Sequence, residues 1–268
     1  MIRRRSRTRR PLLLGLLLAA MVLVAAVALA DGLGGKSARA THYVNAATLS
    51  HPRTPGHTLF SSGFQDGFSS WHLQSLPGRA RIVHGHAYQG ATNARFEVRP
   101  GDVEPETGSA RSEVSGPTFS DGQDLYVRDA IRIPGADTFR GPWQIVQQLH
   151  ESDWSGSPGL ALFLTSGLHL RLGAGDGSPM FWTSGRLRRD RWYDVVYRVR
   201  LSQDPSVGFV EVWVNGKRQR LAGGHYRSHG QTIQASHSYL KLGIYRAAES
   251  SGTSVVEQDD VVVVARPR

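Results

Sequence analysis

Residues 239–245 read YLKLGIY, a stretch in which polar or aromatic side chains alternate with aliphatic ones. Successive side chains of a β-strand point to opposite faces. Tyr239, Lys241 and Tyr245 therefore share one face of a strand, while the two leucines and the isoleucine share the other. This alternation predicts a half-buried strand whose aliphatic face packs on a core.

Similar short segments recur through the rest of the chain, between Gly, Pro, Asn and Asp residues that mark turns. We expect further strands at residues 94–98, 125–133, 143–150, 160–165, 192–199, 209–214 and 255–264. The pair Asn215-Gly216 predicts a type I′ hairpin turn. Many short strands without an internal repeat or a long amphipathic helix favour one all-β domain, a two-sheet antiparallel sandwich or jelly roll.

The N-terminal residues have the pattern of an export signal. Six arginines precede an apolar run at residues 12–30, which ends in Ala-Leu-Ala. We expect residues 1–30 to be a cleaved signal peptide, with an uncleaved membrane anchor as the alternative; Arg9-Arg10 also permits twin-arginine export. Residues 31–57 are expected to be a linker or a loosely ordered segment, and residues 58–268 the folded domain. The protein is then secreted, with no membrane contact after cleavage.

The charge and cysteine content of the chain limit the classes of partner that it can bind. Its 268 residues include 32 Lys and Arg, 22 Asp and Glu and no Cys, so the formal net charge is +10 and disulfides are excluded. Loss of six arginines and no acid with residues 1–30 leaves 10 − 6 = +4. This mildly basic charge suits an acidic polymer as partner, and it is well below the charge of a nucleic-acid-binding tail. We also expect the protein to be a monomer.

A second segment with a polar face is QIVQQLH at residues 144–150. Gln148 and His150 share one face of the predicted strand, whereas Ile145 is expected on the other. Gln147 interrupts this alternation. Polar side chains on a strand are usually solvated, but Gln and His are also types that hold an anion or move a proton.

A third segment, RSEV at residues 111–114, places Arg111 and Glu113 on one face. An ordinary solvated face is filled with Lys, Glu, Thr and Ser, whereas the three segments together supply Arg, Gln, His, Lys and two Tyr. If the three strands are neighbours, these side chains form a groove. We therefore expect a binding or catalytic site across them.

This set of side chains fits the cleavage of a uronic-acid polysaccharide by β-elimination. The C5 proton of a uronate becomes acidic enough to remove only when donors such as Arg, Gln and His neutralise the neighbouring carboxylate. A base then takes the proton and an acid protonates the leaving O4, roles that suit His and Tyr. Positive charge from Lys241 or Arg111 would help a tyrosine to act as a base. The scheme requires no metal or organic cofactor.

The same three segments resemble the signature strands of family-7 alginate lyases, and they occur in the same order. Residues 192–196 (WYDVV) and 212–216 (VWVNG) are more similar to the heparin lyase I and glucuronan lyase branch of the same concanavalin A-like jelly rolls. The resemblance spans about residues 58–266. It implies a concanavalin A-like β-jelly roll and a polysaccharide lyase acting on glucuronan, alginate or a heparin-like glycan.

The resemblance also implies roles for single residues. Arg111 and Gln148 become the pair that neutralises the carboxylate. His150 becomes a further neutraliser or the base, and Tyr245 the acid and a second candidate for the base. Lys241 would bind substrate.

Two more residues, Tyr239 and Glu113, would support the groove. The chain departs from the alginate lyase pattern after Tyr245: the family usually has one residue and then Gln, whereas here Arg246-Ala247-Ala248 follows. The substrate therefore stays open among the uronate polymers, more than the reaction does.

Two other functions fit the same fold. A non-catalytic glycan-binding module of the lectin kind would need no base, so the combination of Gln148, His150, Lys241 and Tyr245 favours the lyase. A glycoside hydrolase would use a Glu-x-Asp-x-Glu run. Here Glu151 and Asp153 fit the first two acids, but Ser155 stands where the third would be.

A few further residues are candidates for contacts outside this set. Trp154 follows the second segment in a Gly- and Ser-rich stretch and is expected to contact substrate. His84 and His86 lack a third partner at metal-ligand spacing, so we assign no metal ligand. Asp259 and Asp260 could touch a structural calcium, which two adjacent acids do not establish.

Overall fold

The computed structural model describes residues 56–151 and 156–267, and these residues fall in one compact unit. The signal peptide and nearly all of the linker expected from the sequence, as well as Trp154, lie outside the described residues. The described chain contains strands and one turn of 3₁₀ helix, Ala222–Gly224, and no α-helix. None of its helices could cross a membrane. The expected all-β class is therefore confirmed.

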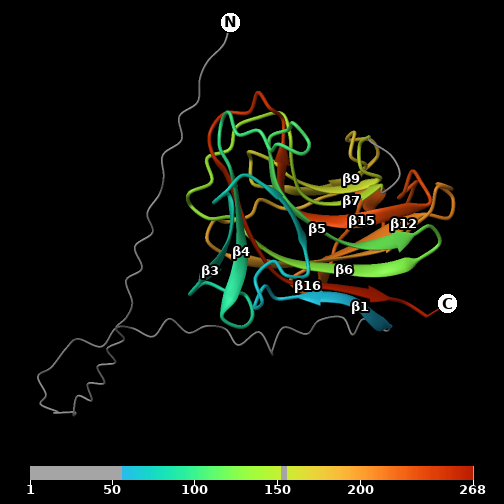
Figure 1. The fold of residues 1–268 in the computed structure, drawn as a ribbon. Coiled ribbons are helices and arrows are strands. Elements are labelled where there is room, and N and C mark those ends of the chain that lie inside the picture. The colour runs from blue at the N-terminus through green and yellow to red at the C-terminus, as the bar shows by residue number, and fades with distance from the viewer. Residues whose placement is uncertain (1–55, 152–155, 268) are drawn as a thin grey trace, which may run out of the picture. The chain divides into compact units, whose positions relative to one another are not determined.

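Two antiparallel sheets form the fold (Figure 1). The nine-stranded sheet contains β1 (His57–Ser62), β3 (Ala80–His84), β4 (Thr92–Val98), β6 (Asp124–Arg132), β11 (Trp192–Arg200), β12 (Phe209–Val214), β13 (Lys217–Arg218), β14 (Ser228–His229) and β16 (Ser254–Ala265). The seven-stranded sheet contains β2 (His72–Ser75), β5 (Arg111–Ser120), β7 (Gln144–Glu151), β8 (Leu160–Leu164), β9 (Leu170–Gly173), β10 (Met180–Thr183) and β15 (His237–Arg246).

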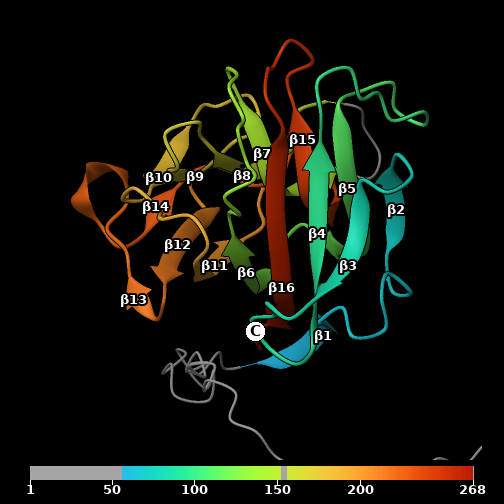
Figure 2. The same cartoon turned by 90° about the vertical axis from the view of Figure 1, so that its left-hand side faces the viewer.

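The two last strands of the chain, β15 and β16, lie inside the two sheets, each between two strands from earlier in the chain. The nine-stranded sheet runs β13-β12-β11-β6-β16-β4-β3, with β1 added to β16 and β14 to β12; the seven-stranded sheet runs β10-β9-β8-β7-β15-β5-β2. In Figure 2, β16 and β4 lie in front of β15 and β5, so the central strands of the two sheets cover one another. This is the layered arrangement of a jelly roll.

Each of the eight strands expected from the sequence is present, with ends that differ by two residues or fewer. The hairpin is present as well: β12 and β13 pair through Val214 and Lys217, and Asn215 and Gly216 both have positive φ, at 49° and 73°. Positive φ at both central residues defines a type I′ turn. The strands that the sequence pattern did not indicate, β1, β2, β3, β9, β10 and β14, have two to six residues each.

The core lies between the sheets and is built by the aliphatic faces of the alternating strands. In β15, Leu240, Leu242 and Ile244 are all buried against it, together with Val114 of β5. Burying one such side chain contributes about 1.5–3 kcal/mol. The polar members of the same strands are thereby forced onto the opposite face of the seven-stranded sheet.

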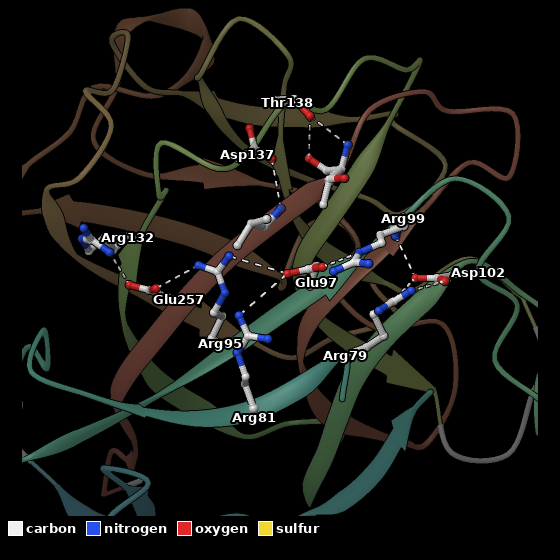
Figure 3. A network of polar contacts seen from close by, with 12 residues as sticks. Arg79, Arg81, Arg95, Glu97, Arg99, Asp102, Arg132, Asp137, Thr138 and Glu257 are labelled. Atoms are coloured by element: carbon white, nitrogen blue, oxygen red, sulfur yellow. Dashed lines mark hydrogen bonds and ion pairs between the residues drawn. The ribbon is translucent and has the colours of Figure 1, made fainter. Parts of the chain in front are cut away.

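The outward side of the nine-stranded sheet carries a network of arginines and carboxylates (Figure 3). Arg95 lies 3.1 Å from Glu257 and 3.6 Å from Glu97, and Glu257 also pairs with Arg132. Arg99 approaches Glu97 to 2.6 Å. The charges on this side of the fold therefore largely neutralise one another.

Candidate active site

The three polar segments identified in the sequence are neighbouring strands. The order β7-β15-β5 sets Lys241 directly opposite Gln148 on one side, and Tyr245 directly opposite Arg111 on the other. Residues directly opposite in antiparallel strands point to the same face. The predicted neighbourhood is therefore present. We call the side of the seven-stranded sheet turned away from the core the site face; it carries Arg111, Glu113, Gln148, His150, Tyr239, Lys241 and Tyr245.

Glu113 is the centre of the polar contacts on this face. Its carboxylate accepts from Nε2 of Gln148 at 2.6 Å, Nζ of Lys241 at 2.8 Å and Nη1 of Arg111 at 3.2 Å. Glu113, Gln148 and Lys241 are each about 1 % exposed. Burial lowers the pKa of Lys241, an effect that the charge of Glu113 opposes. Glu113 thus holds the two cations and the amide in fixed positions.

The aromatic ring of Tyr245 is held from two sides. The Arg111 guanidinium lies 4.2 Å from the ring centroid, and Trp143 packs edge-on with its centroid at 4.9 Å. Arg111 is itself oriented by Ser109, whose Oγ accepts from Nε at 2.6 Å. The Tyr245 hydroxyl bonds to no other described residue. The Tyr245 ring is thus held beside a positive charge.

His150 has one ring nitrogen committed to the backbone. Nδ1 lies 2.9 Å from the carbonyl oxygen of Glu151, and since a carbonyl only accepts, Nδ1 is the donor. In the neutral ring Nε2 is then the acceptor, as a base requires. Tyr239 lies beside it, with ring centroids 5.6 Å apart. Burial, with the charges of Glu113 and Glu151, raises the pKa of Tyr239, although Arg111 opposes this, so Tyr239 is poorly suited to be a base.

Ile145 departs from its expected position. It packs with Tyr245, Trp143 and Phe163 on the site face, not with the core. The pairing register shifts between Ile145 and Gln147 against β8, so the strand contains a bulge and its alternation changes phase there. This bulge is also why Gln147 interrupts the sequence pattern.

A matching irregularity occurs in β15, between Leu242 and Tyr245 against β7. Gly243 lies within it at φ 117°, and a Cβ there would stand 2.2 Å from the carbonyl oxygen of Ser112. Only glycine fits this close approach of β15 to β5. The glycine thereby lets Tyr245 pair with Arg111 and Ile145 together.

A hollow of about 640 Å³ opens beside Tyr245 on the site face. Its walls are largely apolar and include Trp143, Phe163 and Met180. Arg171 of β9 also lines it. The sequence analysis did not single out Arg171; the signal was the triplet LRL at residues 170–172, an arginine between two leucines that the structure buries.

The acids considered for other roles are engaged in structural contacts. Glu151 is buried and accepts backbone N–H groups of Gly159 and Gln234. Asp259 accepts backbone N–H groups of Gln89 and Asp260, and Asp260 pairs with Arg128 at 2.7 Å. Asp259 and Asp260 therefore both have hydrogen-bond or ion-pair partners within the described chain.

The remaining metal candidates do not form a cluster. His84 and His86 are exposed. Among residues 56–151 and 156–267, no group of three or more His, Asp or Glu is placed to hold a metal ion.

Comparison with known proteins adds a family and a fold. A family model described as "Polysaccharide lyase" matches residues 60–261. The structure of an endo-β-1,4-glucuronan lyase from the fungus Trichoderma reesei superposes with a TM-score of 0.57 at 16% identity, covering 78% of this chain and 95% of that one. No curated protein sequence matches.

Two further solved structures share the arrangement. The cellulose-induced protein Cip1 gives a TM-score of 0.53 at 17% identity, covering 76% of this chain and 96% of that one. A family 7 alginate lyase in complex with substrate gives 0.51 at 12% identity, covering 76% and 96%. At such identities these likenesses establish the two-sheet jelly roll and nothing finer.

Proposed function

The chain belongs to the polysaccharide lyase family, and on that premise we propose that it cleaves a uronic-acid-containing polysaccharide by β-elimination. Its substrate class is glucuronan, alginate or a heparin-like glycan, and its product carries a 4,5-unsaturated uronate end. The observation that carries this proposal is the set of donors around Glu113, which holds Arg111 and Gln148 beside Tyr245 and His150 on one face.

Neutralisation of the uronate carboxylate is assigned to Arg111 and Gln148. The Arg111 side chain is 12% exposed, so its guanidinium can meet an anion while it stays bound to Glu113. The Gln148 amide nitrogen donates one hydrogen to Glu113 at 2.6 Å, and its second hydrogen, which bonds to no described residue, is the one we assign to the substrate carboxylate. Donors fixed in advance stabilise the enolate-like charge without reorganisation.

Lys241 and Glu113 act indirectly in this scheme. Both are buried and are paired with each other at 2.8 Å, so the charge of each is already compensated. We assign to them the orientation of Arg111 and Gln148, in place of the direct substrate contact that the family resemblance implies for Lys241. Tyr239 keeps its proton and supports His150 by packing.

The elimination itself moves one proton off carbon and one onto oxygen. Either Nε2 of His150 or the oxygen of Tyr245 takes the C5 proton. The C5–H electron pair then forms the C4=C5 double bond as the C4–O4 bond breaks, and Tyr245 protonates the departing O4. If Tyr245 takes the C5 proton, that same proton passes on to O4. Either route balances without a co-reactant.

The decisive experiment follows ultraviolet absorbance of the conjugated unsaturated uronate. Protein comprising residues 31–268 is mixed in turn with glucuronan, alginate, heparin, heparan sulfate, hyaluronan and chondroitin. A rise with one polymer, lost in the His150→Ala variant, supports the proposal and names the substrate. No rise with any polymer, alongside retained binding in affinity electrophoresis, would replace it with a glycan-binding module.

We also propose that the protein acts outside the cell. The support is the arginine-led apolar run at residues 1–30, which has the composition of a signal peptide. Mass spectrometry of protein recovered from the culture medium of an expressing host tests this, because cleavage predicts a new N-terminus near residue 31.

A further inference from the structure

A row of directly paired side chains crosses five strands of the site face. Tyr245 of β15 stands opposite Arg111 of β5 on one side and Ile145 of β7 on the other. Ile145 pairs in turn with Phe163 of β8, and Phe163 with Arg171 of β9. Because direct partners point to the same face, the row places an arginine at each end and the tyrosine between them.

Arg171 differs from Arg111 in having no acidic partner. It makes no ion pair and no side-chain hydrogen bond with any residue of the described chain. Asp176 also lines the hollow, but it is exposed and its carboxylate accepts the N–H of Ser178. Leu170 and Leu172 are buried on either side, so the backbone holds Arg171 on the site face. Among the described residues, no acid is paired with its charge.

The space between the two arginines is shaped for a saccharide. Four strand spacings separate Arg111 from Arg171, about 19 Å along the sheet. The hollow beside Tyr245 fills the part of this interval nearer Arg171, and Trp143, Phe163 and Met180 give it apolar walls. Such walls suit the apolar face of a sugar ring, while a cation at the far end suits its carboxylate.

We propose that Arg171 is a second carboxylate-binding residue, which holds a uronate in a subsite separate from the one at Arg111 and Tyr245. This inference rests on the proposed function and extends it to specificity. The polymer crosses the strands of the sheet along the row, and the enzyme requires negative charge on a sugar some distance from the cleaved bond. Oligomers too short to span the row gain nothing from Arg171.

The test compares Arg171→Ala and Arg171→Lys with a matched control, Arg186→Ala. Arg186 is an exposed arginine that bonds to no other side chain of the described residues and does not line the hollow. Size-fractionated oligomers of the polymer that the wild type cleaves are the substrates. For long oligomers, Arg171→Ala should raise KM about tenfold to a hundredfold with little change in kcat, as expected for loss of a charge-assisted hydrogen bond made equally in ground and transition states.

Chain length and charge supply the controls. Arg171→Lys should recover part of the loss, Arg186→Ala should match the wild type, and all four proteins should act alike on the shortest cleavable oligomers. An Arg171→Ala enzyme with wild-type KM at every length would overturn the proposal. So would a loss of equal size on short and long oligomers, since that pattern indicates a general disturbance of the site.

Failure of the proposed function is separable from failure of this subsite. If the wild type cleaves none of the polymers, calorimetric binding of the same oligouronates to wild type and Arg171→Ala decides the matter. Weaker binding to Arg171→Ala, with binding to Arg186→Ala unchanged, supports the subsite at Arg171 even though the protein does not cleave these polymers. Equal binding to all three overturns it.

Discussion

Lys241 and Glu113 form an ion pair across β15 and β5, with 2.8 Å between Nζ and Oε2, and neither side chain is more than 2% exposed. A buried pair offers little net stability compared with an apolar replacement, but removal of one partner leaves an uncompensated charge. Glu113 has two other donors, whereas it is the one acid within ion-pair distance of Lys241 in the described chain. Loss of Glu113 therefore leaves the charge of Lys241 uncompensated, whereas loss of Lys241 leaves Glu113 with two donors.

Glu113→Gln should destabilise the fold by about 3–5 kcal/mol, because it leaves Lys241 buried without an acid. Lys241→Met should cost less, since Glu113 keeps Arg111 and Gln148 as donors. The double variant should recover part of the Glu113→Gln loss. Urea unfolding of the three variants measures this cycle. Additive losses would contradict the coupling.

Tyr245→Phe should abolish turnover without altering the fold. The change deletes a hydroxyl that bonds to no other described residue, so the free energy of unfolding should stay within about 0.5 kcal/mol of the wild type. Loss of a general acid should lower kcat about 10²- to 10⁴-fold. Tyr239→Phe is the matched control on the same face and should retain most activity. Equal activity losses in the two variants would remove the special role of Tyr245.

Gly243→Ala should cost at least about 2 kcal/mol of stability, because φ is positive and the new Cβ would meet the Ser112 carbonyl oxygen at 2.2 Å. Gly185→Ala serves as the control, since a Cβ there meets no atom within 4 Å. Thermal unfolding compares the two. The Gly243 variant should also lose activity at temperatures where it remains folded, as the pairing of Tyr245 shifts. A melting curve that matches the Gly185 variant would contradict the assigned strain.

Asp259→Asn should change how stability depends on pH. Burial, with a contribution from Asp260, raises the pKa of Asp259 to about 6 from 3.8. Between these values the native state binds more protons than the unfolded state, so this group makes the free energy of unfolding fall as pH rises from about 4 to 6. Over that window the wild type should lose up to about 3 kcal/mol relative to the variant. Parallel stability curves from urea unfolding at pH 4 to 7 would contradict the shift.

The sequence was sufficient for the strands that alternate over many residues. In β15 the aliphatic residues Leu240, Leu242 and Ile244 recur every second position, so both the core face and the polar face could be predicted. The phase change at Ile145 could not, because a bulge depends on the partner strand and leaves only an interrupted pattern, here at Gln147. Arg171 was missed for another reason: β9 has four residues, too few for a periodic signal.

The roles of the polar residues depend on depth, which the residue pattern does not encode. Lys241 and Tyr245 are four residues apart on the same face of β15, and the sequence pattern does not distinguish their depth. In the structure Lys241 is covered and bonded to an acid, whereas Tyr245 lines a hollow. Three-dimensional packing of the neighbouring side chains thus distinguishes Tyr245, which we propose contacts substrate, from Lys241, which we propose supports the site.

The arginine network on the nine-stranded sheet bears on how a long acidic polymer meets this protein. Arg79, Arg81, Arg95, Arg99 and Arg132 face Glu97, Asp102, Asp190 and Glu257 there, five positive charges against four negative ones. At physiological salt such a balanced array projects little potential beyond about 8 Å. On the proposed function, an acidic polymer that collides with this side should therefore be weakly retained and soon depart. Little substrate would then be held on a face that lies away from the proposed site.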